Sequence, residues 1–507
     1  MIQNASLGQH RKIVAMFLLG CFVCSSLLGQ SDSTSFETDL EAHIQRVMKE
    51  NWIPGAAVVV VQGDKTMFLK GYGMADIDAN RQVTQDTLFY IASSTKSFTG
   101  LAAAICAHQG KLDLNKTLDH CLSDAKFHQD IDPATITLRD LLTHTHGISN
   151  DGPVSFRSAF SGQHTPELLK DLLRLHGVDE NGKEFEYGNI GYNLAGLAMQ
   201  NELGIHWKDL LNQEIFAPLK MESTTGRVSQ ADANQLAMPY QIHPDGFSRL
   251  HYGKADENMH AAGGLVTTAA DLANWLKINI NRGELNGEQL IPEEVFELAH
   301  APLAKQERDM MKFSRDGYGL GWNTGEYDGD RFTHHFGGFN GFHCQISFMP
   351  EKKIGVAILV NSGSGFMFAD VVSRYAYDHL RDVAELDQRF SDQELKDMSA
   401  QAKKRRENIG ADLERRAARP QALLKPLEAY TGTFENEQFG QVVLSVVEGK
   451  LEAVMGPLWS AVETYDAEKN LLRVELLGNG QVVDVQFDGK EQAQRILVYG
   501  DTFTRVE

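Results

Sequence analysis

The feature that most constrains the fold is a set of short, strongly apolar runs that stand far apart along the chain. Residues 56–62 contain four consecutive valines, and residues 66–72 follow them after a Gly63-Asp64 turn. Two further apolar runs, 343–349 and 354–360, come much later. β-Branched runs bounded by turns are typical of buried strands. One sheet must therefore draw its strands from distant parts of the chain.

Helical sequence patterns lie before and between these runs. Residues 36–50 have helical periodicity up to the break at Pro54-Gly55. Residues 94–109 place Phe98, Leu101 and Ile105 on one stripe, and Gly110 is a natural stop. Strands at both ends with helices between them predict the α+β fold class.

The chain changes character after residue 382. Residues 382–419 are rich in charged residues and alanine, which predicts a solvated helical connector. From Leu427 onward, short alternating segments separated by turns predict a small antiparallel barrel or sandwich. We therefore divide the chain as follows: 1–30 signal peptide, 31–385 α+β domain, 386–426 charged helical linker, 427–507 β-domain.

The N-terminus has the pattern of an export signal. Arg11 and Lys12 precede a largely apolar stretch over residues 13–28, and polar residues follow. We expect an exported protein, periplasmic or extracellular. Residues 18–21, Leu-Leu-Gly-Cys, also resemble a bacterial lipobox, so lipidation at Cys21 would give a membrane-anchored alternative. No later segment approaches the roughly 20 apolar residues that a spanning helix needs.

Charge and cysteine content exclude several classes of partner. The formal net charge of -20 repels phosphate backbones, so we expect no nucleic-acid partner. Three of the five cysteines lie beyond the signal, at Cys106, Cys121 and Cys344. Their scattered spacing matches neither a disulfide framework nor a metal site, and we interpret them as small buried hydrophobes.

The first chemical motif is Ser93-Ser94-Thr95-Lys96, at the start of the alanine-rich helix. Residues three apart on a helix share a face. A serine hydroxyl needs a base within reach, and a lysine can be that base when its ammonium is destabilised. The N–H groups at a helix start can also hold an oxyanion. Taken alone, the tetrapeptide is far more typical of an N-cap serine with an exposed lysine.

Two further motifs carry groups that could serve the same reaction. In Tyr187-Gly188-Asn189, a phenol near a lysine ammonium could lose its proton more easily and relay protons. Asn189 could hold a substrate amide or orient Lys96. In the third motif, residues 335–338 (His-Phe-Gly-Gly), the glycines Gly337 and Gly338 let a substrate backbone approach, and the Gly338 N–H could complete an oxyanion hole with Ser93. Each is also credible as an ordinary turn or hairpin.

Metal, cofactor and other hydrolase patterns are absent from the sequence. The pairs His144-x-His146 and His334-His335 could be metal ligands, but no H-E-x-x-H and no carboxylate at matching spacing accompany them. There is no G-x-S-x-G elbow, no phosphate-binding loop and no convincing dinucleotide fingerprint. We therefore expect neither a metal nor a cofactor.

The three motifs in this order resemble the serine β-lactamase and penicillin-binding protein superfamily, in its class C-like (CubicO-type) branch of esterases and peptidases. The family pattern is S-x-x-K, then Y-x-N, then K-T-G or H-x-G. The segments 136–148, 261–272 and 318–322 are similar to the family as well, and the resemblance covers about residues 36–382. It implies a β-lactamase/transpeptidase-like domain, and the C-terminal region resembles a lipocalin-like appendage of some members.

The resemblance implies a role for each motif residue. Ser93 becomes the acylated nucleophile, Lys96 its activator and Tyr187 the general base and acid. Asn189, His335 and Gly337 become substrate-site residues, and the backbone of Ser93 and Gly338 the oxyanion hole. Histidine in place of the K-T-G lysine is associated with esterases and peptidases more than with potent β-lactamases, so it weakens the expectation of antibiotic hydrolysis.

We expect a hydrolase that acts on esters, D-amino-acid peptides or β-lactam-like amides. One alternative is a penicillin-binding sensor that reacts at Ser93 and turns over negligibly. A second is a structural envelope protein whose terminal barrel docks a partner. The intact Tyr187 favours turnover, because a sensor needs no deacylation base.

Overall fold

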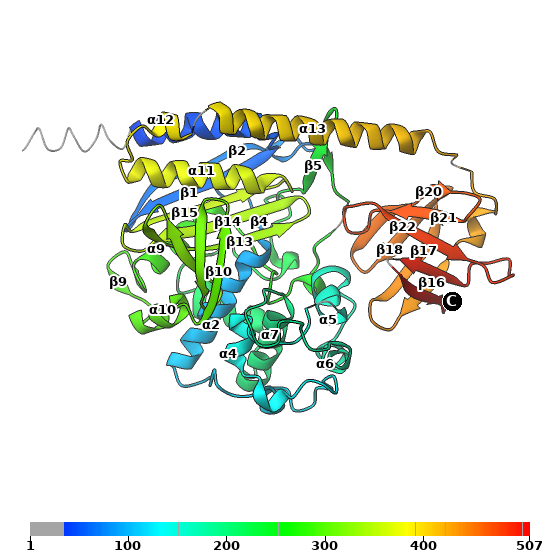
Figure 1. Ribbon diagram of the computed structural model, residues 1–507, viewed down its shortest axis with the longest axis horizontal. Coiled ribbons are helices and arrows are strands. Elements are labelled where there is room, and N and C mark those ends of the chain that lie inside the picture. Colours follow the sequence, from blue (N-terminus) through cyan, green and yellow to red (C-terminus); the bar gives the residue numbers. More distant parts are fainter. Residues whose placement is uncertain are drawn as a thin grey trace, which may run out of the picture.

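The computed structural model describes residues 35–150, 152–251, 253–390, 392–420, 422–498 and 500–506. They form a large unit of helices packed on a sheet and a smaller C-terminal β-barrel, with one long helix running from the first to the second (Figure 1). The predicted α+β class and the antiparallel barrel are confirmed. The predicted signal peptide and the lipobox at Cys21 lie outside the described residues.

The large unit is built on a nine-stranded sheet in the order β10-β11-β12-β13-β14-β15-β1-β2-β3. Every neighbouring pair in it is antiparallel. The strands are β1 (Gly55–Gln62), β2 (Lys65–Asp76), β3 (Arg81–Gln82), β10 (Ala304–Met310), β11 (Phe313–Tyr318), β12 (Asn323–Tyr327), β13 (Asp330–Phe339), β14 (Phe342–Met349) and β15 (Ile354–Val360). As the apolar runs predicted, β1 pairs with the distant β15.

The valines of β1 explain why this sheet lies between two layers of helices. Successive side chains of a strand point to opposite faces. Val58 and Val60 enter the core beneath the N-terminal helix (35–51) and α11 (Gly365–Leu380), whereas Val59 and Val61 enter the core formed with the helices between residues 95 and 300. Both faces of β1 are thus buried, and its sequence is apolar without alternation.

The second helical layer carries the motif segments. Its helices are α2 (Thr95–His108), α3 (Leu118–Cys121), α4 (Leu138–Thr143), α5 (Pro153–Phe156), α6 (Pro166–Leu172), α7 (Ile190–Leu203), α8 (Trp207–Leu211), α9 (Ala269–Ile280) and α10 (Glu293–His300). Three two-stranded sheets accompany them: β4 (Phe89–Tyr90) with β7 (Val266–Thr267), β5 (Tyr240–His243) with β6 (Gly246–Arg249), and β8 (Glu284–Leu285) with β9 (Glu288–Gln289). The segment just before α2 is hydrogen-bonded to β13, and the segment just before α7 lies close to the same strand.

The charged segment after α12 (Leu386–Arg389) forms the long helix α13 (Asp392–Ala417), which crosses the top of the large unit in Figure 1. Its first half is less solvated than its composition suggests. Leu395 and Met398 are buried in the same core as the N-terminal helix. The Arg406 guanidinium lies 3.5 Å from the centroid of the Trp52 ring. The helix is therefore packed against the large unit.

The C-terminal unit is a nine-stranded antiparallel sheet in the order β19-β18-β17-β16-β24-β23-β22-β21-β20, curled into a nearly closed barrel. Its strands are β16 (Gly432–Asn436), β17 (Gly440–Val447), β18 (Lys450–Met455), β19 (Leu458–Ala461), β20 (Glu463–Asp466), β21 (Leu471–Val474), β22 (Gln481–Gln486), β23 (Arg495–Val498) and β24 (Asp501–Arg505). Burial alternates along β17, β18 and β22, which gives the barrel its own apolar interior.

One end of the barrel contacts the large unit through polar and aromatic groups. The buried Arg157 donates from Nε to the Gln438 carbonyl and from Nη2 to the Glu437 carbonyl, both at 2.7 Å. The Phe156 and Phe439 rings meet edge to face, with centroids 5.1 Å apart. Charged donors that fill carbonyl acceptors in this way hold the two units in one orientation.

Two features expected from the sequence can be placed within the described residues. Cys106, Cys121 and Cys344 are buried and unbridged, as predicted. Of the described helices, none is both long and apolar enough to cross a membrane.

Candidate active site

Ser93 stands at the entrance of α2, in the 3-10 turn η1 (Ala92–Ser94). The residue before it, Ala92, has φ +45°, in the left-handed region that residues other than glycine rarely occupy. Such local strain is stored at functional sites more often than elsewhere. Ser93 is partly exposed, whereas Lys96, one turn later, is fully buried. The turn thus presents a hydroxyl to solvent with an amine beneath it.

The Lys96 amine has three polar neighbours. Its Nζ donates to Asn189 Oδ1 and to the Ala262 carbonyl, each at 2.8 Å, and lies 3.2 Å from Ser93 Oγ. No carboxylate among the described residues forms an ion pair with it. Burial lowers the pKa of Lys96 well below its ordinary value, because the charged form loses its hydration.

Tyr187 lies beside this amine and in contact with the serine. Lys96 Nζ lies 4.9 Å from the centroid of the Tyr187 ring, and the phenol hydrogen-bonds Ser93. Burial raises the pKa of Tyr187 to about 12, and the bond to Ser93 only partly offsets it. Burial therefore outweighs the expected easing of proton loss from the phenol. The buried amine is the group whose pKa falls.

Asn189 faces the lysine, so the structure favours the second of its two predicted roles. Its backbone N–H donates to Asn150 Oδ1 at 2.6 Å, and the same oxygen accepts the Ile190 N–H at 3.0 Å. Asn150 thereby holds the start of α7, where Asn189 is the N-cap. With its backbone fixed, the Asn189 side-chain oxygen can orient Lys96 Nζ.

Strand β13 closes the site on the opposite side. Ser94 Oγ donates to the His335 carbonyl at 3.4 Å, which joins β13 to the turn η1. A Cβ added at Gly337 would lie 1.9 Å from the Ile91 carbonyl oxygen, so only glycine allows this approach. Gly338, the next residue, is exposed. The predicted oxyanion residues Ser93 and Gly338 thus belong to two backbone segments that touch each other.

The His335 imidazole lies beneath the site with both nitrogens occupied. Nδ1 lies 2.8 Å from the Phe336 carbonyl, and Nε2 lies 3.2 Å from the Tyr318 hydroxyl. A carbonyl can only accept, so Nδ1 carries the hydrogen and Nε2 accepts from Tyr318. Burial, and then the nearby Lys96, lower the pKa of His335 well below its ordinary value. His335 therefore supplies no positive charge for a substrate carboxylate.

Sequence reasoning missed four groups that support the motif residues. Ala262 supplies its carbonyl because β7 pairs with β4, immediately before the serine turn. His144 accepts the Gly188 N–H at 3.3 Å, and its ring centroid lies 4.7 Å from that of Tyr187. The other two are Asn150 and Tyr318. The only sequence signal for them was resemblance to the family, because His144, Ala262 and Tyr318 lie within the family-like segments 136–148, 261–272 and 318–322.

The described residues contain no group of three or more His, Cys, Asp or Glu side chains that could hold a metal ion. The two histidine pairs considered from the sequence point elsewhere. His144 and His335 belong to the tyrosine-lined site, and His146 Nδ1 accepts the Ile148 N–H at 3.0 Å.

Comparison with known proteins yields matches over most of the chain. The family model described as Beta-lactamase matches residues 40–380. "Protein flp" of Staphylococcus aureus (strain MW2) is 26% identical over 337 residues, which are 65% of this chain and 64% of that protein. The chain thus spans less than two thirds of that relative's length.

Two further matches cover a similar or larger share of the chain. "Unguisins hydrolase ungD'" of Aspergillus campestris is 27% identical over 364 residues, or 69% of this chain and 66% of that protein. The solved structure of the octameric penicillin-binding protein homologue from Pyrococcus abyssi superposes with a TM-score of 0.58 at 21% identity. That match covers 92% of this chain and 99% of the other, so the shared fold extends beyond the part that the family model matches.

Proposed function

Because the chain belongs to the beta-lactamase family, we propose that it is a serine hydrolase that forms an acyl-enzyme on Ser93. The proposal rests on one observation, the hydrogen bonding of Lys96. A neutral amine has two N–H groups and one lone pair. Asn189 and Ala262 accept the two N–H groups, so the lone pair is left for the Ser93 hydroxyl. Lys96 is then the base that serine chemistry requires.

Acylation follows from this arrangement. As Ser93 Oγ attacks the substrate carbonyl, its proton passes to Lys96. The backbone N–H groups of Ser93 and Gly338 hold the oxygen that becomes negative in the tetrahedral intermediate. When that intermediate collapses, the phenol of Tyr187 protonates the leaving group. Lys96 then returns its proton to Tyr187.

Deacylation uses the same groups in the reverse direction. Water attacks the Ser93 ester, and its proton passes to the neutral Lys96 through the Tyr187 phenol, which gives up one proton as it takes up another. When the tetrahedral intermediate collapses, the proton returns to Ser93 Oγ and the acid is released. A pKa of about 12 keeps Tyr187 a neutral phenol at neutral pH, which suits a proton donor and relay. The neutral Lys96 is the base that receives the nucleophile's proton, from Ser93 in acylation and from water in deacylation.

The neutral His335 supports a preference for substrates that need no cation to hold a carboxylate. We propose esters as the best substrates, followed by D-amino-acid peptides and β-lactam-like amides. The Aspergillus relative is named a hydrolase, which agrees with this class of reaction. We also propose that the chain is exported, on the pattern of residues 11–28.

Covalent labelling tests this proposal. Purified protein is treated with a fluorescent penicillin and with a fluorophosphonate, and the adduct is located by intact mass and peptide mapping. We expect one adduct on Ser93, none on Ser93→Ala, and a normal adduct on the matched control Ser123→Ala, which changes an exposed serine outside the site. An adduct that persists on Ser93→Ala would remove Ser93 as nucleophile.

The lifetime of the adduct separates an enzyme from the alternative, a penicillin-binding sensor. We expect rapid loss of the acyl group and turnover of p-nitrophenyl esters above that of nitrocefin. A stable penicillin adduct together with no turnover of esters or D-alanyl peptides would favour the sensor. Efficient nitrocefin hydrolysis would contradict the inference drawn from His335.

A further inference from the structure

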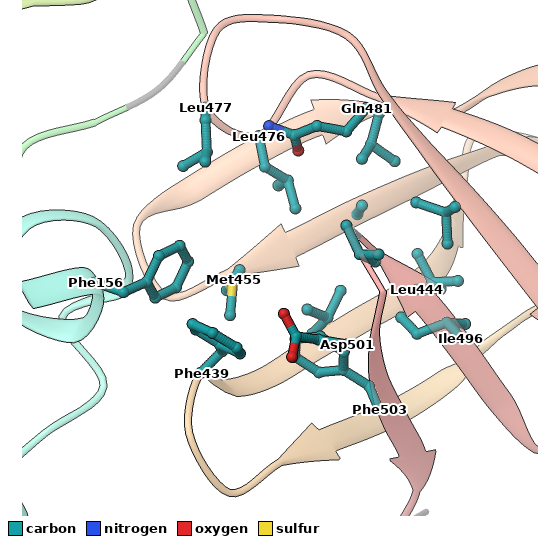
Figure 2. A pocket seen from close by; sticks show the side chains of 15 residues that line it. Phe156, Phe439, Leu444, Met455, Leu476, Leu477, Gln481, Ile496, Asp501 and Phe503 are labelled. Carbon is teal, nitrogen blue, oxygen red and sulfur yellow. The ribbon is translucent and has the colours of Figure 1, made fainter. Parts of the chain in front are cut away.

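The C-terminal barrel contains a half-open cavity of about 220 Å³. Its walls are almost wholly apolar, and Figure 2 shows the lining side chains converging on it from the strands. They are Phe156, Phe439, Val442, Leu444, Ala453, Met455, Val474, Leu476, Leu477, Gln481, Val483, Ile496, Val498, Asp501 and Phe503. Phe156 comes from the large unit, and all the others belong to the barrel.

A cavity of this size is unusual for a small barrel. Protein interiors are close-packed, with few voids larger than a water molecule. A barrel of about eight strands either fills its interior with side chains or holds one small ligand. An engineered apolar cavity of about 150 Å³ stays dry and binds benzene. The larger cavity here therefore has room for a hydrocarbon group and walls that favour one.

The cavity lies at the barrel end that faces the large unit. Phe439, Met455, Leu477 and Asp501 stand at four strand-to-strand turns of that end. Phe156 reaches across from the large unit to the same place and meets Phe439 edge to face (Figure 2). Docking of the barrel thus completes the wall of the cavity.

One charged group lies among the apolar walls. The Asp501 carboxylate is partly exposed and, in Figure 2, points into the cavity beside Phe439. It has no hydrogen-bonding or ionic partner within the part of the chain that the structure describes. A carboxylate only accepts hydrogen bonds, so its natural ligand is a cationic donor.

We propose that the barrel binds a small amphipathic amine, with its aliphatic chain in the cavity and its ammonium group at Asp501. This site is separate from the reactive serine and does not depend on the function proposed for it. The apolar walls supply affinity through burial of the chain. Asp501 supplies the preference for a positive over a negative end.

Calorimetric titration with primary alkylamines tests the proposal. We expect n-octylamine to bind in a 1:1 ratio, and affinity to rise about fourfold per methylene from butylamine upward until the cavity is full. Octanoate should bind more weakly than octylamine. Absence of saturable octylamine binding to the wild-type protein would overturn the proposal.

Variants locate the bound chain. Ala453→Phe places a ring in the cavity and should weaken octylamine binding at least tenfold, whereas Val443→Phe places one on the outer face of β17 and should have no effect. Asp501→Asn should weaken octylamine about threefold and abolish its advantage over octanoate. Equal binding by wild-type and folded Ala453→Phe protein would place the amine elsewhere and refute the proposal.

A second measurement needs no cavity-filling variant. In protein labelled with ¹³C-methyl methionine, octylamine should shift the signal of Met455, assigned by its loss in Met455→Leu. An unshifted Met455 signal at saturating octylamine contradicts the proposal even if Ala453→Phe fails to fold. Because binding is read without catalysis, failure here leaves the serine mechanism untouched, and the reverse also holds.

Discussion

We expect alanine to have opposite effects at two adjacent glycines of β13. In Gly337→Ala, the new Cβ would lie 1.9 Å from the Ile91 carbonyl oxygen and 3.1 Å from the Ser94 nitrogen. In Gly338→Ala, the nearest atom is His343 Nδ1 at 4.0 Å, an ordinary contact. Both variants keep the backbone N–H groups. They differ in whether β13 can stay against the turn that carries Ser93.

The size of the effect follows from the required displacement. Cβ atoms essentially never approach a neighbouring atom closer than 3.0 Å, so β13 and the serine turn must separate by about 1 Å in Gly337→Ala. A misplacement of 1 Å at a reacting centre costs about 100-fold in rate. Overpacking of this kind also costs about 1–3 kcal/mol of stability. Gly338→Ala should stay close to the wild-type rate.

Hydrolysis of p-nitrophenyl acetate measures the difference directly. We expect kcat/KM to fall about 100-fold in Gly337→Ala and to change less than about threefold in Gly338→Ala. Titration with a fluorophosphonate, together with circular dichroism, reports whether the loss is one of alignment or of folded protein. Wild-type kcat/KM in Gly337→Ala, or an equal loss in both variants, would refute the reasoning.

Three further changes test other parts of the structure. Burial lowers the pKa of Lys96, and only its neutral amine accepts a proton. The value of kcat/KM should therefore rise with pH to a plateau, with a midpoint well below the ordinary lysine pKa. A midpoint near that ordinary value, or full activity in Lys96→Arg, would contradict this. Burial of His43, which lies in the N-terminal helix with its ring stacked on Tyr375, lowers its pKa to about 3, below the roughly 6.5 of the unfolded chain. Its contribution to stability is therefore complete above pH 6.5 and falls with decreasing pH. Urea unfolding at pH 7.5 and pH 5 should therefore show a loss about 2 kcal/mol smaller in His43→Phe than in the wild type, and equal losses would count against it. Arg157→Ala removes the donors to two barrel carbonyls, so hydrogen exchange over residues 436–441 should quicken at least tenfold; unchanged exchange would mean that the barrel is held by other contacts.

Local sequence was sufficient for the elements that position the nucleophile. The valines of β1 and the stripe around Phe98 are repeating patterns, and each forms the predicted element. Residue type and periodicity were enough for these two elements. The first motif begins one of them, α2, whereas α7 and β13, which carry the other two motifs, were not predicted from a repeating pattern.

The supporting groups could not be read in the same way, because they act through backbone atoms or through distant packing. Ala262 contributes a carbonyl oxygen, which every residue possesses, and its position depends on the pairing of β4 with β7. Whether the pKa of Tyr187 rises or falls depends on how deeply the phenol is buried, and sequence alone does not reveal this. The cavity depends on how side chains from several strands fill the barrel. Such properties emerge only from the assembled fold.

The pairing of β1 with β15 determines how late in synthesis the central sheet can be completed. During synthesis, the valine-rich first strand leaves the ribosome with β2 as its only partner in the sheet, and its other edge stays open until Val360 has been added. Long-range pairing of this kind is slow and leaves aggregation-prone edges exposed. Nascent chains that stop before β15 should therefore depend on a holding chaperone, and they carry the serine without the strands that complete its surroundings.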